Sequence, residues 1–309
     1  MSDSASLSAP ARERRSRLTG IALMTGAVAC FACLDASAKY LNGYIDTLEV
    51  VWARYFFSLV TVFTLLPRYG LFGLVGTTRL GLQAGRGSLI LATTLLAFVA
   101  LRFLPIADTY AISFVAPLMV AAASVPLLGE TIGRGQWLAI LGGFLGVLVV
   151  VRPGLGAFSW AAGLPLLMAV GNVAVQIMTR RMSVGEGAAT TMFYTSLAGS
   201  IGMSILLPFV WTPPSVAAWL LMAMMGAAGF AGQLLLFLAF RAAPASLVSP
   251  FAYTQIVWAI PIGWLAFGDL PDVATVCGGA IVVLSGLALA RLGRRGRARG
   301  GTEPAADAA

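Results

Sequence analysis

An acidic and a basic residue, Asp35 and Lys39, stand four positions apart near the end of the first long apolar stretch of the sequence. On a helix this spacing places both side chains on one face with the acid first, which is the favourable order for an ion pair. A charged group inside an apolar membrane helix is costly unless it is paired or faces water, so such groups are candidates for function. Two interpretations remain open: a local ion pair at a helix end, or a site for a substrate or a proton.

Arg54 lies a few residues into the second apolar stretch. Its long side chain could extend to the lipid headgroups, or it could face the protein interior and neutralise a carboxylate or an anionic ligand. Proton coupling would require a titrating carboxylate, and Asp35, Glu49 and Asp108 are the candidates for it. Asp108 follows Pro105 by three residues and is alternatively the N-terminal cap of a helix.

Uncharged polar and aromatic side chains interrupt the remaining apolar stretches. In lipid their polar groups must be hydrogen-bonded, and bonds between helices are the ordinary solution; aromatic residues also anchor helices at the membrane interface. Tyrosine and tryptophan rings together with amides would suit a flat heteroaromatic ligand. The predicted substrate-binding residues are Asp35, Lys39, Arg54, Tyr110, Ser113, Asn172, Gln176, Tyr194, Gln233, Tyr253, Gln255 and Trp258.

The whole sequence is too apolar for a soluble domain. Of its 309 residues 59% are apolar and 10% are charged, and the mean hydropathy is +0.90, whereas soluble domains are about 45–50% apolar and about 25% charged. The sequence therefore predicts a protein embedded in a lipid bilayer. Its net charge of +8 comes largely from arginines at the two ends rather than on one face, so no nucleic-acid partner is expected.

Cofactor chemistry is not expected either. The sequence contains no histidine and three cysteines. Cys30 and Cys33 form a CxxC pattern inside an apolar stretch, without the second pair or the histidines that a zinc site needs. We therefore expect no metal and no other cofactor, and we interpret the two cysteines as small residues that pack between helices.

Ten apolar stretches approach the roughly 20 residues that a helix needs to cross a bilayer. The expected spans are 18–37, 48–67, 83–102, 105–127, 136–152, 159–179, 190–210, 216–239, 245–267 and 273–291. The expected fold class is thus an all-α polytopic membrane protein with ten transmembrane helices. The connections are too short to hold a soluble domain, so the function must reside within the membrane.

The arginines predict the orientation of these spans. Two clusters flank the apolar region: Arg12, Arg14, Arg15 and Arg17 before it, and Arg291, Arg294, Arg295, Arg297 and Arg299 after it. Positive residues favour the cytoplasmic side, which places both termini in the cytoplasm. The expected organisation is a cytoplasmic basic tail at 1–17, a five-helix repeat at 18–152, a second five-helix repeat at 159–291, and a cytoplasmic disordered tail at 292–309.

The two repeats are visible as an internal similarity. At a constant offset of 139 residues, four positions match: Arg102 with Arg241, Pro105 with Pro244, Gly129 with Gly268, and Glu130 with Asp269. After a shorter loop, Gly142 and Gly143 match Gly278 and Gly279. A unit of five spans is odd, so the second copy must enter the membrane from the opposite side, which is the inverted-topology arrangement of many transporters. Two such halves can alternate between outward-open and inward-open forms.

These residues also carry a family likeness. The stretch LPIADTYAISFVAPLMVAAASVPLLGE, the basic residue Lys39 after the first span, the ARYF motif at 53–56 and the repeat resemble the drug/metabolite transporter superfamily, in its two-domain EamA type. The likeness extends over about residues 18–292, and the opening CLDASAKYL resembles the riboflavin and S-adenosylmethionine group. The second half departs from the pattern, with Arg180 and Arg181 in place of Lys39 and with Tyr194 near the place of Arg54.

The resemblance implies a secondary transporter and not an enzyme. We expect it to take up riboflavin or a similar heteroaromatic metabolite across a bacterial inner membrane, as a monomer. An exporter of amino acids, metallophores or drugs is the main alternative. A membrane-embedded enzyme is disfavoured because no histidine and no compact group of carboxylates is present, and a passive channel is disfavoured because channels of this size usually form their pore from several subunits.

Overall fold

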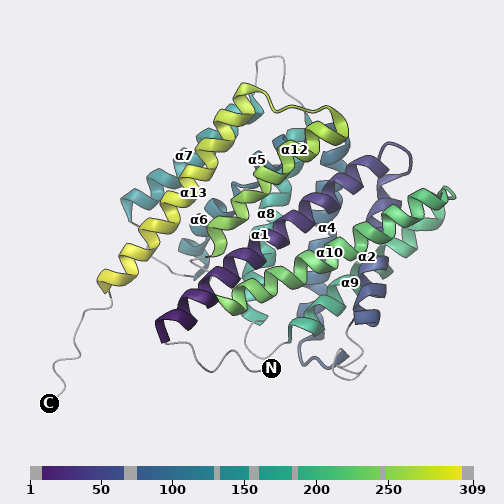
Figure 1. The fold of residues 1–309 in the computed structure, drawn as a ribbon, viewed down its shortest axis with the longest axis horizontal. Coiled ribbons are helices and arrows are strands. Elements are labelled where there is room, and N and C mark those ends of the chain that lie inside the picture. Colours follow the sequence, from purple (N-terminus) through teal and green to yellow (C-terminus); the bar gives the residue numbers. More distant parts are fainter. Residues whose placement is uncertain are drawn as a thin grey trace.

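The structure, a computed structural model, describes residues 9–65, 75–128, 133–152, 160–182, 187–243 and 248–300. Within these ranges the chain is helical and contains no strand (Figure 1). The expected all-α class is confirmed for this part of the chain. Among the residues used above, Gly129, Glu130 and Pro244 lie outside the described ranges.

The helices form a bundle in which most long axes run in similar directions (Figure 1). The helices of the first half are α1 (Ala9–Leu41), α2 (Thr47–Leu65), α4 (Leu80–Phe103), α5 (Ile106–Ser113), α6 (Ala116–Leu128) and α7 (Arg134–Val151). Those of the second half are η2 (Trp160–Ala162), α8 (Gly163–Met182), α9 (Ala188–Leu206), η3 (Leu207–Phe209), α10 (Val216–Ala242), η4 (Ser249–Thr254), α12 (Gln255–Phe267) and α13 (Val273–Gly300).

Many of these helices are suited to lipid. In the described part of the chain, six are long and apolar enough to cross a membrane: Ser16–Leu41, Leu80–Phe103, Arg134–Val151, Ala189–Phe209, Val216–Ala239 and Val273–Leu292. Three shorter apolar segments accompany them, at Ile106–Met119, Trp160–Val175 and Phe251–Phe267. These segments and α2 overlap the other four stretches expected from the sequence, and the count of ten membrane-crossing helices stays a prediction.

The helices of the two halves pair with each other in a repeated pattern. Helix α1 of the first half packs on α10 of the second half. The helix that corresponds to α1 in the second half, α8, packs on α4 of the first half. The equivalent helices α2 and α9 pack together, as do α7 and α13, and α5 of the first half packs on α12 of the second half. Figure 1 shows α7 beside α13 at one side of the bundle, and α2, α9 and α10 gathered at the other. The two halves therefore interlock instead of forming separate domains.

Two of the expected spans are broken at matching positions. The span at 105–127 divides into α5 and α6 at Phe114 and Val115. Pro117, the second residue of α6, accounts for the break, because its ring clashes with the carbonyl four residues earlier. The span at 245–267 divides between η4 and α12. With the offset of 139, Phe114 corresponds to Tyr253. The rings of these two residues meet edge to face, with centroids 5.1 Å apart.

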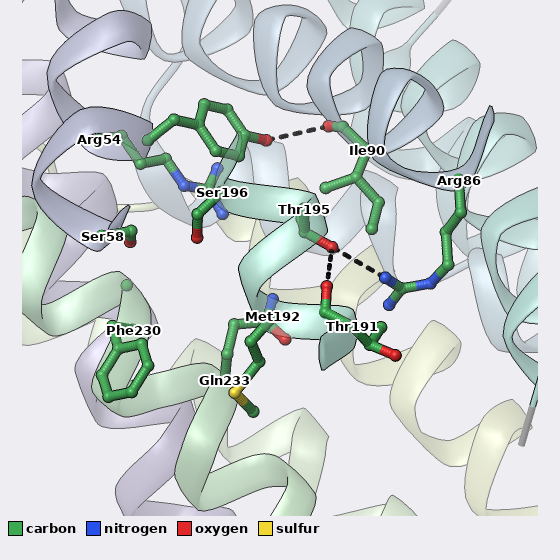
Figure 2. Close-up of a pocket in the computed structure, with 12 residues that line it drawn as sticks. Arg54, Ser58, Arg86, Ile90, Thr191, Met192, Thr195, Ser196, Phe230 and Gln233 are labelled. Carbon is green, nitrogen blue, oxygen red and sulfur yellow. Dashed lines mark hydrogen bonds between the residues drawn. The ribbon is translucent and has the colours of Figure 1, made fainter. Parts of the chain in front are cut away.

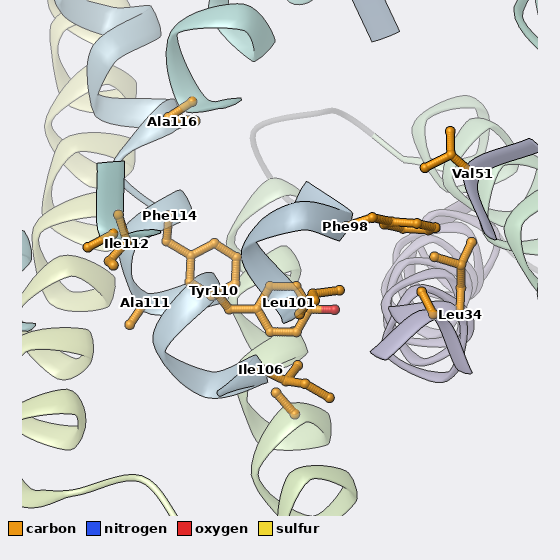
Figure 3. Packing of buried hydrophobic residues seen from close by; sticks show 14 of the residues in the cluster. Leu34, Val51, Phe98, Leu101, Ile106, Tyr110, Ala111, Ile112, Phe114 and Ala116 are labelled. Carbon is orange, nitrogen blue, oxygen red and sulfur yellow. The ribbon is translucent and has the colours of Figure 1, made fainter. Parts of the chain in front are cut away.

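The core near the first break is tightly packed. Phe98 and Leu101 from α4 lie against Ile106 and Tyr110 from α5, with Leu34 of α1 on the far side (Figure 3). All five side chains are buried. In lipid such packing, together with interhelical hydrogen bonds, holds a bundle together, because lipid tails are as apolar as the side chains themselves.

Both ends of the chain differ from the sequence-based expectation. α1 begins at Ala9, so part of the expected basic tail is helical and continuous with the first span. α13 continues to Gly300, so residues 292–300 are helical and the expectation of a disordered tail is wrong for them. The beginning of α1 and the end of α13 lie at the same end of the bundle (Figure 1).

Asp272 begins α13 as its N-terminal cap. Its Oδ1 accepts a hydrogen bond from the backbone N–H of Thr275 at 2.8 Å, and its Oδ2 accepts one from Arg152. Replacement by alanine removes the cap, and we expect Asp272→Ala to lower the free energy of unfolding by about 1 kcal/mol, whereas Asp272→Asn retains an acceptor and costs less. More than half of the Asp272 side chain is exposed, so water screens its ion pair with Arg152.

This contribution depends on pH. The hydrogen bond from Arg152, followed by that from Thr275, lowers the pKa of Asp272 from 3.8 to about 2. Because the folded-state pKa lies below the unfolded-state value, the stabilisation by the carboxylate is fully present above about pH 4 and is lost as the pH falls toward 2. Thermal unfolding of the purified protein in detergent checks this; equal melting temperatures of wild type and Asp272→Ala at pH 7 would contradict it.

Candidate functional site

A pocket opens between α2, α4, α9 and α10 (Figure 2). Two arginines, several hydroxyl groups and one amide line it among apolar side chains. The lining residues are Arg54, Tyr55, Ser58, Arg86, Ile90, Thr191, Met192, Thr195, Ser196, Gly229, Phe230 and Gln233. Both halves of the chain thus contribute to one polar space inside an apolar bundle.

Arg54 reaches the pocket from α2. Its Nη1 donates a hydrogen bond to Thr94 Oγ1 at 2.9 Å, and the same hydroxyl exchanges a 2.7 Å hydrogen bond with Tyr55. Its guanidinium carbon also lies 5.3 Å from the ring centroid of Tyr55 and 5.5 Å from that of Phe98, which is the range of cation–π contacts. Of the two sequence-based alternatives, the structure therefore shows Arg54 facing the interior rather than the headgroups.

Arg86 reaches the pocket from α4. Its Nη1 donates to Thr195 Oγ1 at 2.9 Å, and that hydroxyl donates in turn to the backbone oxygen of Thr191 at 2.8 Å. Figure 2 shows this chain of contacts on one side of the pocket and Arg54 on the other, with Ser196 between them. The two guanidinium groups thus border the same cavity from two different helices.

A second polar group lies between α1, α5 and α12. Tyr110 donates its hydroxyl proton to the carboxylate of Asp35, and Gln255 lies close enough to influence the same hydroxyl. The Tyr253 ring meets Phe114, and its hydroxyl lies directly against Gly286 of α13, where a Cβ atom would clash with it. Four of the predicted substrate-binding residues, Asp35, Tyr110, Tyr253 and Gln255, thus lie on neighbouring helices, and their role in binding stays a prediction.

At the end of the bundle opposite Ala9 and Gly300, Lys39 joins α1 to α12. Its Nζ donates to Asp269 Oδ2 at 2.5 Å and to the backbone oxygen of Leu104 at 3.2 Å, and it lies 5.0 Å from the ring centroid of Phe267. Asp269 directly follows Gly268, which ends α12. The φ of Gly268 is +71°, in the left-handed region that glycine adopts without strain. Within the described residues no ion pair joins Asp35 to Lys39, so the interpretation of a local pair is wrong.

Further contacts close the same end of the bundle. The fully buried Glu49, in the first turn of α2, accepts two hydrogen bonds from Thr212, at 3.1 Å from its N–H and 3.0 Å from its hydroxyl. The indole rings of Trp52, Trp211 and Trp219 meet with centroids 5.9–6.3 Å apart.

Asp108, which the sequence offered as a helix cap, is instead the acceptor for the hydroxyl of Thr275 at 2.7 Å. The N-cap of α5 is Pro105, and it makes no side-chain capping bond. Asp108 therefore joins α5 to α13 at this closed end.

The remaining predicted site residues do not gather at one place. Ser113 donates to the backbone of Thr109 in its own helix, and Tyr194 donates its hydroxyl proton to the backbone oxygen of Val75. Asn172 is half-buried on α8, Trp258 is 40% exposed, and the side chain of Gln176 lies outside the described residues. Of the twelve predicted residues, Arg54 and Gln233 line the pocket.

Sequence reasoning missed Arg86 and the hydroxyl groups of α9. Arg86 is not among the predicted substrate-binding residues, although it stands inside the span expected at 83–102. Since α4 begins at Leu80, Arg86 lies well inside the helix, and its position within the span was the sign that could have identified it. The hydroxyls of Thr191 and Thr195 stand four residues apart, which places them on one helix face.

A helical bundle with apolar spans and a polar pocket between its two halves defines a membrane transport protein. The chain belongs to the EamA-like transporter family, whose profile matches residues 18–152 and again 155–291. The resemblance stated from the sequence is thereby confirmed. The protein is a multi-pass membrane transporter and not an enzyme.

Three bacterial relatives align over most of their length. The pseudopaline exporter CntI of Pseudomonas aeruginosa is 26% identical over 279 residues, which cover 88% of this chain and 96% of the relative. The riboflavin transporter of Vibrio cholerae is 27% identical over 272 residues, covering 87% and 91%. The S-adenosylmethionine uptake transporter of Rickettsia conorii is 24% identical over 266 residues, covering 86% and 90%.

A crystal structure with 17% sequence identity superposes on this fold with a TM-score of 0.62, over 91% of this chain and 98% of that chain. The likeness supports the helical architecture over nearly its whole length. The relatives differ in substrate and in direction, so membership of the family defines transport, and the substrate must be argued from the site.

Proposed function

We propose that this protein is a secondary transporter that moves a small metabolite across a bacterial inner membrane by alternating access. Ten transmembrane helices form two inverted five-helix repeats, and a single chain suffices because both halves of the site are present in it. The observation that carries the proposal is the matched pairing of the halves, α1 with α10 and α8 with α4, around a polar pocket. Such a pairing is what two inverted repeats require.

The arrangement of contacts supports alternating access. The pocket lies toward the end of the bundle where α4 and α9 begin and α10 ends. The opposite end is closed by the pair of Lys39 and Asp269 and by the hydrogen bonds of Glu49. With both termini cytoplasmic, this is an inward-facing form, and its exchange with an outward-facing form would require the Lys39–Asp269 contact to open.

Riboflavin or a similar heteroaromatic metabolite is the proposed substrate, taken up into the cell. The rings of Tyr110, Phe114 and Tyr253 pack against one another at the broken helices, and they would have to separate to stack on a flat ligand, with Asp35 and Gln255 as orienting groups. The relative from Vibrio cholerae is named a riboflavin transporter. Export is the second candidate, favoured by the pseudopaline exporter, which aligns over 96% of its own length.

Counterflow in proteoliposomes tests this function. Vesicles loaded with unlabelled riboflavin should accumulate labelled riboflavin transiently, and accumulation should saturate with concentration. Growth of a riboflavin auxotroph at low vitamin concentration should improve when the chain is expressed. Empty vesicles and cells with an empty vector are the controls. Absence of counterflow together with absence of a growth response would discard riboflavin as the substrate.

Labelling of single cysteines tests the orientation. In a variant without Cys30, Cys33 and Cys277, a cysteine at the exposed Tyr44, between α1 and α2, should react with a membrane-impermeant reagent from outside intact cells. A cysteine at Ala305 should react only after the membrane is opened. Reaction of both positions from outside, or of neither, would contradict the proposed topology.

A further inference from the structure

We infer that the pocket beside Arg54 binds an uncharged, hydroxyl-bearing part of the substrate through Ser196 and Gln233. This inference rests on the proposed function, because it names the part of the substrate that this pocket holds. Riboflavin has such a part, since it consists of a flat ring system and a flexible ribityl chain that carries hydroxyl groups. The inference is carried by two polar side chains without a partner in the protein and by the position of the pocket beside the region of Tyr110.

Ser196 presents a hydroxyl group to the pocket from α9. The residue is 7% exposed and lines the cavity, and among the residues that the structure describes its hydroxyl has no hydrogen-bond partner. The hydroxyl of the preceding residue, Thr195, instead donates to the backbone oxygen of Thr191 one turn earlier, which is a usual way to satisfy a hydroxyl on a helix. A nearly buried polar group without a protein partner is normally satisfied by water or by a ligand. Ser196 is therefore available to a substrate.

Gln233 presents a second such group from α10. It is half-buried and lines the same pocket, and in the described part of the chain its amide makes no hydrogen bond. An amide has two N–H donors and an acceptor oxygen, and a hydroxyl has one donor and two acceptor lone pairs. Both groups are uncharged, so they suit uncharged partners that donate and accept. Successive hydroxyls on a flexible chain can reach partners on different helices, whereas the edge of a flat ring system needs partners in one plane.

The arginines of the pocket also contact hydroxyl groups. Arg54 donates to the hydroxyl of Thr94. Arg86 donates to the hydroxyl of Thr195. A hydroxyl oxygen of a substrate offers the same kind of acceptor to a guanidinium group. The charge of Arg54 is opposed within the protein by Asp35, so an uncharged ligand can bind beside Arg54 without bringing a counter-ion.

The pocket adjoins the region proposed for the flat ring. Asp35, whose charge interacts with that of Arg54, accepts the hydrogen bond of Tyr110. A substrate with its ring beside Tyr110 would therefore extend its chain past Arg54 toward Ser196 and Gln233. Since Ser196 and Gln233 belong to the second half of the chain and Arg54 to the first, the bound substrate would contact both halves, whose relative position changes during alternating access.

Two flavins separate the ring from the chain. Lumiflavin has the ring system of riboflavin with a methyl group in place of the ribityl chain. Dissociation constants of both are measured for the purified protein in detergent, from the quenching of flavin fluorescence. We expect riboflavin to bind at least about tenfold more tightly than lumiflavin, as for a few hydrogen bonds between uncharged groups.

Ser196→Ala and Gln233→Leu should each weaken the binding of riboflavin by about threefold to tenfold, the effect of one lost hydrogen bond. Both should leave the binding of lumiflavin unchanged, whereas a general structural effect would weaken both ligands. Ser200→Ala is the matched control. Ser200 follows Ser196 by one turn on α9, is 6% exposed and has an unpartnered hydroxyl in the described structure, but it does not line the pocket. This variant should change neither dissociation constant.

The chain can also be tested without the ring. In the variant without native cysteines, Met192→Cys places a thiol in the pocket. Ribitol, which represents the chain alone, should slow the reaction of this thiol with N-ethylmaleimide. Diethylene glycol dimethyl ether, an uncharged molecule of similar size without hydroxyls, should not do so at the same concentration. Gln233→Leu should abolish the protection by ribitol.

Equal binding of riboflavin and lumiflavin would overturn the inference, as would unchanged binding of riboflavin, or equal losses for both flavins, in Ser196→Ala and Gln233→Leu. If neither flavin binds, the ribitol experiment decides: protection supports the inference for another hydroxyl-bearing substrate, and lack of protection overturns it. None of these measurements depends on transport, so the proposed function stands or falls separately, by counterflow.

Discussion

Lys39→Ala should lower the initial rate of transport by at least about tenfold while the protein remains in the membrane at near-normal abundance. The side chains of Lys39 and Asp269 are 16% and 33% exposed, so their ion pair is partly shielded from water. Removal of the lysine leaves the carboxylate of Asp269 without its partner at the closed end of the bundle, which is more costly than the loss of an exposed pair. A change of 1.4 kcal/mol in the balance of two forms alters their ratio tenfold.

Exchange of the two charges separates the role of the pair from direct contact with substrate. Asp269→Lys alone should be as inactive as Lys39→Ala, whereas Lys39→Asp combined with Asp269→Lys should recover a substantial part of the rate. Arg102→Ala removes an exposed arginine near the same end of the bundle and should retain wild-type transport. Full activity of Lys39→Ala would remove the pair from the mechanism, and failure of the exchanged pair to recover would assign Lys39 to the substrate instead.

The state of the closed end can be followed in the same variants. A cysteine at Ser58, which lines the pocket, should react faster with an impermeant reagent added outside when Lys39 is replaced by alanine. This result is expected because a population shift toward the outward-open form exposes the pocket to that side. Unchanged labelling in the variant would show that the pair does not hold this end closed.

The case of Lys39 shows what sequence reasoning could and could not supply. The spacing of Asp35 and Lys39 correctly places both on one face of α1, but helix periodicity does not identify the partner of either group. The hydroxyl of Tyr110 and the carboxylate of Asp269 come from other helices, and their approach is fixed by packing over long sequence separations. Proximity along the helix was therefore a poor guide to pairing.

The sequence predicted the architecture more completely than it predicted the residues of the pocket. The length of an apolar stretch reflects the thickness of the bilayer, and the arginines beside it reflect its orientation. Both signals can be read from a short piece of sequence. The repeat at an offset of 139 even matches the positions at which two spans break. The pocket depends instead on which face of each helix turns toward the interior, and the sequence does not show this directly. Arg54 was therefore identified as a candidate, whereas Arg86, which also lines the pocket, was not.

Gly278→Ala and Gly146→Ala should each destabilise the protein, although alanine is the better helix former by about 1 kcal/mol. A Cβ atom at Gly278 would lie 2.6 Å from the backbone oxygen of Gly146, and one at Gly146 would lie 2.8 Å from the backbone oxygen of Gly278. The obstacle in both cases is backbone, so no change of rotamer relieves it, and α7 and α13 must separate. Overpacking of this kind costs about 1–3 kcal/mol.

The sign of the change is the test, because propensity and packing predict opposite results. Gly163→Ala at the start of α8 is the matched control: nothing lies within 4 Å of a Cβ atom there, so it should be neutral or slightly stabilising. Melting temperatures and monodisperse yield in detergent should fall for Gly146→Ala and Gly278→Ala and stay level for Gly163→Ala. Since α7 and α13 occupy equivalent places in the two halves, unaltered stability in both variants would mean that this close helix contact does not hold the halves together.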